Sequence, residues 1–138
     1  MPAPAISTTE KVLYSGRTHT SGGRDGHTRS SDGLVDLTLK QPHPAAENLF
    51  AAAWSACFIA AVQVAAAQRK VALPASPEID AEIDLNQADG GYFLRARLNV
   101  SVPGVDKETA RTLVDAAHEI CPYSKATRGN IDVAINVI

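Results

Sequence analysis

The chain has 138 residues, of which 45% are hydrophobic and 20% charged, with a formal net charge of -2. This is an ordinary globular composition, and the absence of repeats or low-complexity linkers predicts a single domain over residues 1–138. The near-neutral charge, without blocks of like charge, argues against nucleic acid as a partner. The first residues, MPAPAISTTEKV, lack a basic segment followed by an apolar run, so we expect no secretion signal and a cytoplasmic location.

A strand, a turn and a hairpin are predicted in the first 40 residues. Residues 11–19 are rich in β-branched and aromatic side chains and lead into the glycine-rich turn GGRDG at residues 22–26. The Asp-Gly pair at residues 32–33 is a strong hairpin signal between residues 28–31 and 34–39. Alternating apolar residues in the second strand predict one buried face, made by Val35, Leu37 and Leu39. The residues Gln41-Pro42-His43-Pro44 should then end the strand.

A long apolar helix is predicted over residues 47–69, ENLFAAAWSACFIAAVQVAAAQR. Its surface is apolar in almost every direction, as expected for a helix in a core. The run approaches the roughly twenty residues that span a bilayer, but its many alanines contribute little transfer energy. Without this helix the neighbouring elements would have no core, so we expect no membrane insertion.

The remaining residues predict a second hairpin, a helix and a last strand. Residues 78–86 and 92–102 alternate apolar and polar residues on either side of Asp-Gly-Gly at residues 89–91. Asp106 is a plausible cap for a helix whose buried stripe reaches Cys121 in its last turn, where Pro122 ends it. Residues 131–137 form the last strand. The order of elements predicts an α+β protein with antiparallel sheets around helices.

Cys57 and Cys121 are the candidate reactive groups. A permanent disulfide between them is not expected under cellular reductants, but a transient one is possible. Burial alone raises the pKa of a thiol and makes it inert. Lowering a thiol pKa by two units takes about 2.7 kcal/mol, and one charge-assisted hydrogen bond is worth about 1.5–3 kcal/mol. Arg24 is the best candidate donor, because the glycines around it let the backbone approach another element.

Glu47 is the candidate partner of Arg24. It lies ten residues before Cys57, about 15 Å along one helix, so the two side chains cannot meet within one chain. If Glu47 positions Arg24, carboxylate and thiol come from different subunits of a two-fold dimer. Simpler roles remain open: an exposed turn arginine, a glutamate at a helix N-terminus, and two structural buried cysteines. A zinc site with His118 matches no common ligand spacing.

Several segments together resemble one known family. They are KVLY (11–14), GGRDG (22–26), SSDG (30–33), ENLFAA (47–52), SACF (55–58), CPYS (121–124) and ATRGNI (126–131). The chain resembles, along nearly its whole length, the organic hydroperoxide resistance proteins of the OsmC superfamily. This resemblance implies an OsmC-like fold with antiparallel sheets wrapped around a long buried helix, and an intertwined homodimer with active sites at the subunit interface.

The resemblance also implies a function, a thiol peroxidase that reduces organic hydroperoxides, including those of fatty acids. Cys57 would be the peroxidatic cysteine and Cys121 the resolving one, with Arg24 and Glu47 activating the thiolate. The implied reductant is a lipoylated protein or dihydrolipoamide, and no metal or other cofactor is expected. Large apolar residues near Cys57 could bind an alkyl tail, although each could equally serve in core packing. They are Leu49, Phe50, Trp54 and Phe58.

Two departures and two rival functions accompany this resemblance. The family commonly has Asn-Pro before the glutamate and a glycine-rich loop before that, whereas here Pro44-Ala45-Ala46 and a shortened loop precede Glu47. One rival is an OsmC-type peroxidase of broader substrate range. The other is a non-enzymatic module that senses oxidation or binds a hydrophobic ligand. Sustained turnover separates an enzyme from a sensor, which would be oxidised once per thiol pair.

Overall fold

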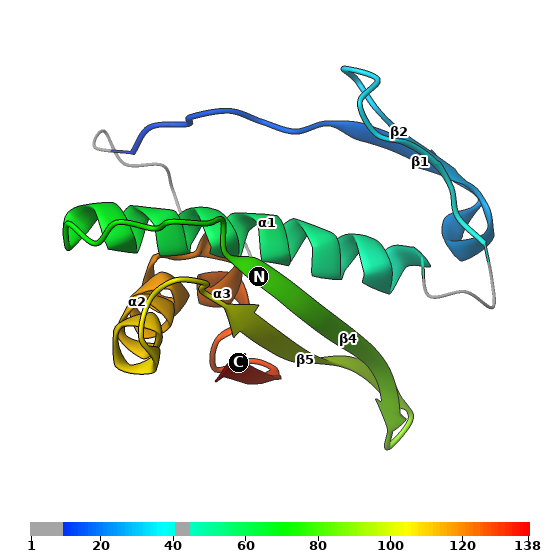
Figure 1. Ribbon diagram of the computed structural model, residues 1–138. Helices are drawn as coiled ribbons and strands as arrows, with labels where there is room; N and C mark the ends of the chain where they lie inside the picture. Colours follow the sequence, from blue (N-terminus) through cyan, green and yellow to red (C-terminus); the bar gives the residue numbers. More distant parts are fainter. Residues whose placement is uncertain (1–9, 41–44) are drawn as a thin grey trace. The chain divides into compact units, whose positions relative to one another are not determined.

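The computed structural model describes residues 10–40 and 45–138 (Figure 1). The chain divides after residue 43 into two compact units. The expected break at residues 41–44 lies outside the described residues, and the single-domain expectation stays a prediction.

The first unit contains a three-stranded antiparallel sheet in the order β1-β2-β3. Its strands are β1 (Thr18–Ser21), β2 (His27–Ser30) and β3 (Asp36–Thr38). The predicted strand over residues 11–19 is wrong in position, because β1 begins at Thr18. On its other edge β2 pairs with β3, and on this edge it pairs only with residues 18–21, so residues 11–17 belong to no strand in the described chain.

The glycine-rich turn is as tight as predicted. A 3-10 turn, η1 (Gly23–Asp25), connects β1 to β2, and Gly22 and Gly23 have φ angles of 76° and 61°. A Cβ atom at Gly26 would overlap the carbonyl oxygen of Ser21, so only glycine fits there. Arg24 is therefore carried by a backbone whose shape its neighbouring glycines determine.

The hairpin between β2 and β3 forms, but its predicted buried face does not. Val35 and Leu37 are 38% and 42% exposed, and only Leu39 is buried. In its described residues the first unit has no α-helix to cover this face. The alternation of apolar and polar residues thus predicted the strand correctly, but the apolar face that it normally buries is exposed in the single chain.

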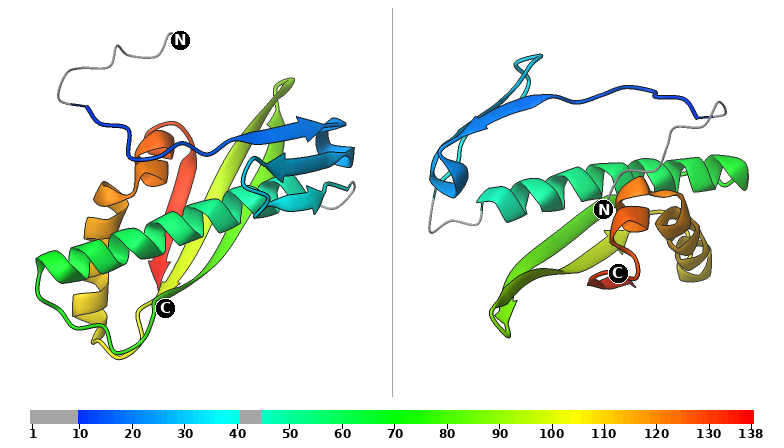
Figure 2. Two further views of the ribbon diagram at one scale, coloured as in Figure 1. Left: turned by 90° about the horizontal axis from the view of Figure 1, so that it is seen from above. Right: turned by 180° about the vertical axis from the view of Figure 1, so that it is seen from behind.

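The second unit packs three helices with a second three-stranded sheet, ordered β4-β5-β6 (Figure 2). The helices are α1 (Ala45–Gln68), α2 (Lys107–Ile120) and α3 (Pro122–Thr127). The strands are β4 (Glu78–Ala88), β5 (Gly91–Ser101) and β6 (Asp132–Val137). Helix α1 contacts both β4 and α2, and the buried core lies between these elements. This α+β arrangement confirms the predicted class.

The second sheet contains one strand pair that was predicted and one that was not. Strands β4 and β5 form the predicted hairpin around Asp89 and Gly90, both of which have positive φ angles, as a two-residue turn of type I′ requires. Strand β6, however, pairs with β5 in parallel, contrary to the expected antiparallel sheet. The reason is that α2 and α3 carry the chain back across the sheet before β6 begins.

Helix α1 is buried on one side only within the described chain. Trp54, Phe58 and Val62 are fully buried against the core. A second stripe is exposed, made by Ala53, Ala56, Ala60, Val64 and Ala67. The helix is long and apolar enough to cross a membrane by length and composition, which the core helices of soluble proteins also are. The expectation of no membrane insertion stays a prediction.

Candidate active site

Cys57 and Cys121 lie together in the second unit. Cys57 is half-buried in the middle of α1, and Cys121 is completely buried at the junction of α2 and α3. Their side chains are in hydrogen-bond contact. Two free thiols 64 residues apart in sequence are thus brought into contact, which formation of a disulfide between them requires.

The environment of Cys57 disfavours its thiolate. Burial, followed by the hydrogen bond and the charge of Cys121, raises the pKa of the Cys57 thiol. One contact acts in the opposite direction, because the backbone N–H of Tyr123 donates toward the sulfur and lowers the pKa. The balance fits the sequence argument that burial alone leaves this thiol unreactive and that a cation must come from elsewhere.

Cys121 is held where one helix ends and the next begins. Helix α2 starts at the predicted cap, where the Asp106 carboxylate accepts hydrogen bonds from the backbone N–H and hydroxyl of Thr109, at 2.8 and 2.9 Å. Its last turn closes when the Cys121 N–H donates to the Ala117 carbonyl at 2.8 Å. Pro122 then occupies the first position of α3, a position that proline favours. Pro122 ends α2 as predicted, but the sequence reasoning missed α3.

A buried hydrogen bond runs beside the cysteine pair. The indole Nε1–H of Trp54 donates to the Ser124 hydroxyl at 3.2 Å, and both side chains are completely buried. Sequence reasoning did not single out Ser124. The sequence signal for this contact was a matching spacing. Ser124 follows Cys121 by three residues, and Cys57 follows Trp54 by three residues.

His118 lies one helical turn before Cys121. Its ring lies 6.5 Å, centroid to centroid, from the ring of Phe58, the residue after Cys57. The Nδ1 atom is buried and has no hydrogen-bond partner among the described residues. Burial, and secondarily the charge of Arg128, lowers the pKa of His118. This histidine therefore favours its neutral form.

Arg24 and Glu47, the predicted activating residues, belong to different units. Arg24 is exposed in η1 of the first unit, whereas Glu47 is buried in the first turn of α1 in the second. Because α1 is continuous from Ala45 to Gln68, Glu47 and Cys57 remain about 15 Å apart along one helix. Their action on the Cys57 thiolate stays a prediction.

The four predicted substrate-wall residues have unequal exposure. Trp54 and Phe58 are completely buried, Leu49 is half-buried, and Phe50 is 37% exposed. Phe50 meets Trp54 edge to face, with ring centroids 6.0 Å apart. Phe50 and Leu49 thus retain accessible apolar surface near the start of α1, whereas Trp54 and Phe58 belong to the packed core. Whether any of them contacts a substrate stays a prediction.

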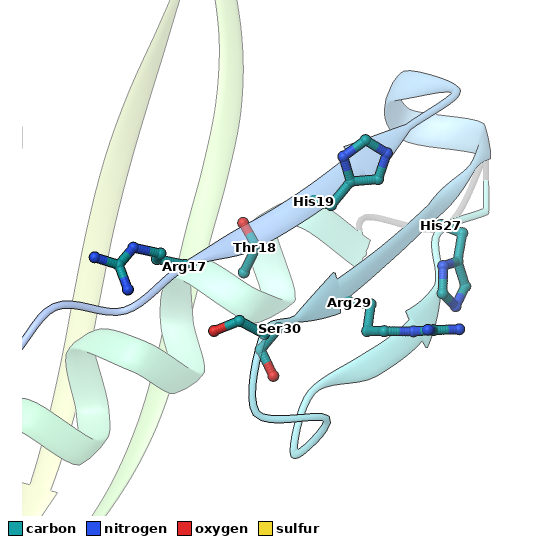
Figure 3. A pocket seen from close by; sticks show the side chains of 7 residues that line it. Arg17, Thr18, His19, His27, Arg29 and Ser30 are labelled. Carbon is teal, nitrogen blue, oxygen red and sulfur yellow. The ribbon is translucent and has the colours of Figure 1, made fainter.

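A separate cavity of about 530 Å³ lies within the first unit (Figure 3). It is lined by Arg17, Thr18, His19, His27, Arg29, Ser30 and Ser31. The Asp36 carboxylate contacts two of these side chains, at 2.5 Å from His27 Nε2 and 3.6 Å from Arg29 Nε. In the part of the chain that the structure describes, no three His, Cys, Asp or Glu side chains cluster as a metal site would require.

Comparison with known proteins places the chain in one family. The family model described as OsmC-like protein matches residues 39–136. An organic hydroperoxide resistance protein of Xanthomonas axonopodis pv. citri is 43% identical over 96% of this chain and 99% of its own length. Organic hydroperoxide resistance protein OhrB of Bacillus subtilis is 36% identical over 91% of this chain and 98% of its own length.

Solved structures give the same result. The crystal structure of OhrB from Bacillus subtilis superposes with a TM-score of 0.84 at 38% identity, covering 92% of this chain and all of that one. A structure from Elizabethkingia anophelis, also of an organic hydroperoxide resistance protein, has a TM-score of 0.85 at 35% identity, covering 93% of this chain and 98% of that one. The OsmC-like fold is therefore confirmed, and the chain belongs to the organic hydroperoxide resistance proteins of the OsmC superfamily.

Proposed function

We propose that this protein is a cysteine-based peroxidase that reduces organic hydroperoxides, including those of fatty acids, to alcohols. The observation that carries the proposal is the contact between the Cys57 and Cys121 thiols in the second unit. Membership of a family whose relatives are named for organic hydroperoxide resistance supplies the substrate class. No metal or other cofactor is required, because two thiols carry both electrons.

The first step is attack of the Cys57 thiolate on a peroxide oxygen. A sulfur–oxygen bond forms, the O–O bond breaks, and the departing alkoxide takes a proton to become the alcohol. Arg24, positioned by Glu47, stabilises the thiolate and then the charge that develops on the alkoxide. The Tyr123 N–H, whose hydrogen bond acts to lower the pKa of Cys57, also stabilises the thiolate. Cys57 is left as a sulfenic acid.

The second step regenerates a stable form of the enzyme. The Cys121 thiol attacks the Cys57 sulfenic acid, a disulfide forms, and the hydroxyl leaves as water with the thiol proton. This reaction protects Cys57 from further, irreversible oxidation. A dithiol must then reduce the disulfide, and we propose a lipoylated protein or dihydrolipoamide in the cytoplasm as the donor.

Substrate preference follows from apolar surface on the helix that carries the thiol. Leu49 and Phe50 keep exposed area that an alkyl tail can cover, while hydrogen peroxide offers no apolar atoms. Trp54 supports Phe50 from the core through the edge-to-face contact of their rings. We therefore expect a higher kcat/KM for bulky organic hydroperoxides than for hydrogen peroxide.

The proposed functional form is a homodimer with shared sites. Apolar residues are exposed in both units, including Val12, Leu13 and Tyr14 at 69–90% and the alanine stripe of α1. A surface of this kind usually marks an interface. Co-expressing a Glu47→Ala chain with a Cys57→Ser chain provides the test. Mixed dimers regain about half the wild-type activity per dimer, which is full activity per Cys57 thiol, if Glu47 acts across the interface, whereas none returns if it acts within its own chain.

Steady-state turnover tests the proposed reaction. Purified protein is supplied with cumene hydroperoxide, a fatty-acid hydroperoxide or hydrogen peroxide, with dihydrolipoamide and then glutathione as reductant. Repeated turnover of the organic peroxides with the lipoyl dithiol is the expected result. Absence of turnover with every dithiol, after one disulfide per chain has formed, would favour a redox sensor. The raised pKa of Cys57 is the observation that keeps this alternative open.

A further inference from the structure

The hydrogen bond between Trp54 and Ser124 has the location and geometry to control the cysteine pair. It joins α1 to α3 one helical turn from the place where Cys57 meets Cys121. Trp54 precedes Cys57 by three residues and Ser124 follows Cys121 by three, so the two segments run past each other in opposite directions. The two contact points are therefore separated by about 4.5 Å along α1.

We propose that Trp54 and Ser124 are positioning residues for disulfide formation, and that their hydrogen bond fixes α3 against α1 so that Cys121 faces the Cys57 sulfenic acid. The inference rests on the proposed function for the identity of the reacting species. Two contacts a turn apart resist rotation of α3 about the thiol contact, which one contact alone would allow. Disulfide formation demands a narrow range of distance and dihedral angle between the two cysteines.

Because both partners are buried, losing this hydrogen bond costs more free energy than losing an exposed one. Trp54 and Ser124 have no exposed surface, so water cannot replace either partner when the other is removed. Ser124 also accepts the Arg128 N–H at its carbonyl at 2.8 Å, and Thr127 Oγ1 donates to the same carbonyl at 3.2 Å. These contacts hold Ser124 within α3, whose first turn includes the hydrogen bond from the Lys125 N–H to the Cys121 carbonyl at 3.0 Å. The hydroxyl contact then ties that segment to α1.

The reaction that this contact serves is balanced by groups already present. Cys57 as sulfenic acid and Cys121 as thiol form the S–S bond while the S–O bond of Cys57 breaks, and the hydroxyl leaves as water with the Cys121 proton. Displacement of reacting groups by about 1 Å can cost on the order of 100-fold in rate. A looser α3 therefore leaves the sulfenic acid exposed to a second peroxide for longer.

The first test measures the disulfide at equilibrium and needs no peroxide. Ser124→Ala, Trp54→Phe and the double variant are equilibrated in mixtures of dihydrolipoamide and lipoamide, and the oxidised fraction is read by intact mass. Each single variant should lower the equilibrium constant for the Cys57–Cys121 disulfide about tenfold. The double variant should lower it no further, because both single changes remove the same contact. Val100→Ala, which removes buried methyl groups from β5, is the stability-matched control and should leave the constant unchanged.

The second test follows one oxidation with dimedone trapping and mass spectrometry. Ser124→Ala should form the Cys57 sulfenic acid at the wild-type rate, and both single variants should close the disulfide about tenfold more slowly and accumulate sulfinic acid. Wild-type closure in the variants, additive effects in the double variant, or an equal effect of Val100→Ala would overturn the proposal. A wild-type protein that forms the disulfide with lipoamide yet ignores peroxide would instead refute the proposed function, and the equilibrium test would still decide the role of Trp54 and Ser124.

Discussion

Replacing Arg24 with alanine should slow alkylation of Cys57 at neutral pH by about 10- to 150-fold, which is the factor that about 1.5–3 kcal/mol of lost thiolate stabilisation produces. The structure supplies the reason for expecting so large an effect. Burial and Cys121 raise the pKa of Cys57, and only the Tyr123 N–H opposes them within the second unit. If Cys57 is to react at neutral pH, most of the stabilisation must come from a cation.

The assay is the pH dependence of iodoacetamide alkylation in a Cys121→Ser background, so that only Cys57 reacts. The rate follows the thiolate fraction, so loss of the guanidinium should move its midpoint to higher pH. Arg24→Lys should recover part of the shift, because an ammonium supplies charge without the planar fork of arginine. Arg17→Ala removes an exposed cation from the same unit and should leave the profile unchanged.

Two outcomes would refute the reasoning about Arg24. Superimposable profiles for the Arg24 and Arg24→Ala proteins would mean that the cation acts elsewhere or that Cys57 needs none. An equal shift in Arg17→Ala would mean that the general positive charge of the first unit, and not one hydrogen bond, sets the reactivity. Raising the salt concentration separates these cases, since long-range charge effects are screened more strongly than a direct contact.

Three further predictions concern the thiols, α2 and His118. Cys57→Ser should abolish peroxide consumption, whereas Cys121→Ser should allow one reduction per chain and then accumulate sulfinic acid, both readable by mass spectrometry. Asp106→Ala should lower the Tm by about 3 °C at neutral pH. Because Thr109 lowers the pKa of Asp106, this difference should disappear as acid protonates the folded carboxylate, as thermal melts would record. Burial lowers the pKa of His118, so the unfolded chain takes its proton first as pH falls below about 6.5, and stability drops. His118→Gln should show a smaller drop in urea titrations.

Local signals predicted most of the second unit. The Asp-Gly-Gly sequence at residues 89–91 predicted a hairpin, which forms with Asp89 and Gly90 as its two turn residues, both at positive φ angles. Asp106 capped α2, whose apolar stripe correctly predicted the burial of Cys121. The long apolar run became α1 within two residues of its predicted ends. Each of these features depends on residues only a few positions apart, which is why sequence alone sufficed.

Features that depend on distant partners were not predictable in this way. Strand β1 covers only the residues that pair with the four residues of β2. Strand β6 runs parallel to β5 because α2 and α3 carry the chain across the sheet before it begins. The exposed faces of Val35 and Leu37 show that alternation predicts a strand without guaranteeing a neighbour to cover it. The hydrogen bond from Trp54 to Ser124 joins residues 70 positions apart, and no local pattern indicates it. Of the candidate site, the cysteine contact is observed, while the roles of Arg24 and Glu47 stay predictions.

The reactive groups are divided between the two units, and this division separates the stability of the disulfide from the rate of attack on peroxide. Cys57, Cys121 and the hydrogen bond beside them all lie in the second unit, whereas Arg24 lies in the first. Measured below the pKa of Cys57, where the reduced form is a thiol with or without Arg24, the stability of the disulfide should therefore respond to Ser124 and not to Arg24. The rate of attack on peroxide should respond to Arg24 and not to Ser124. Because these dependences do not overlap, comparing the two variants in both assays distinguishes a loss of thiolate from a loss of alignment, which a single measurement of turnover would combine.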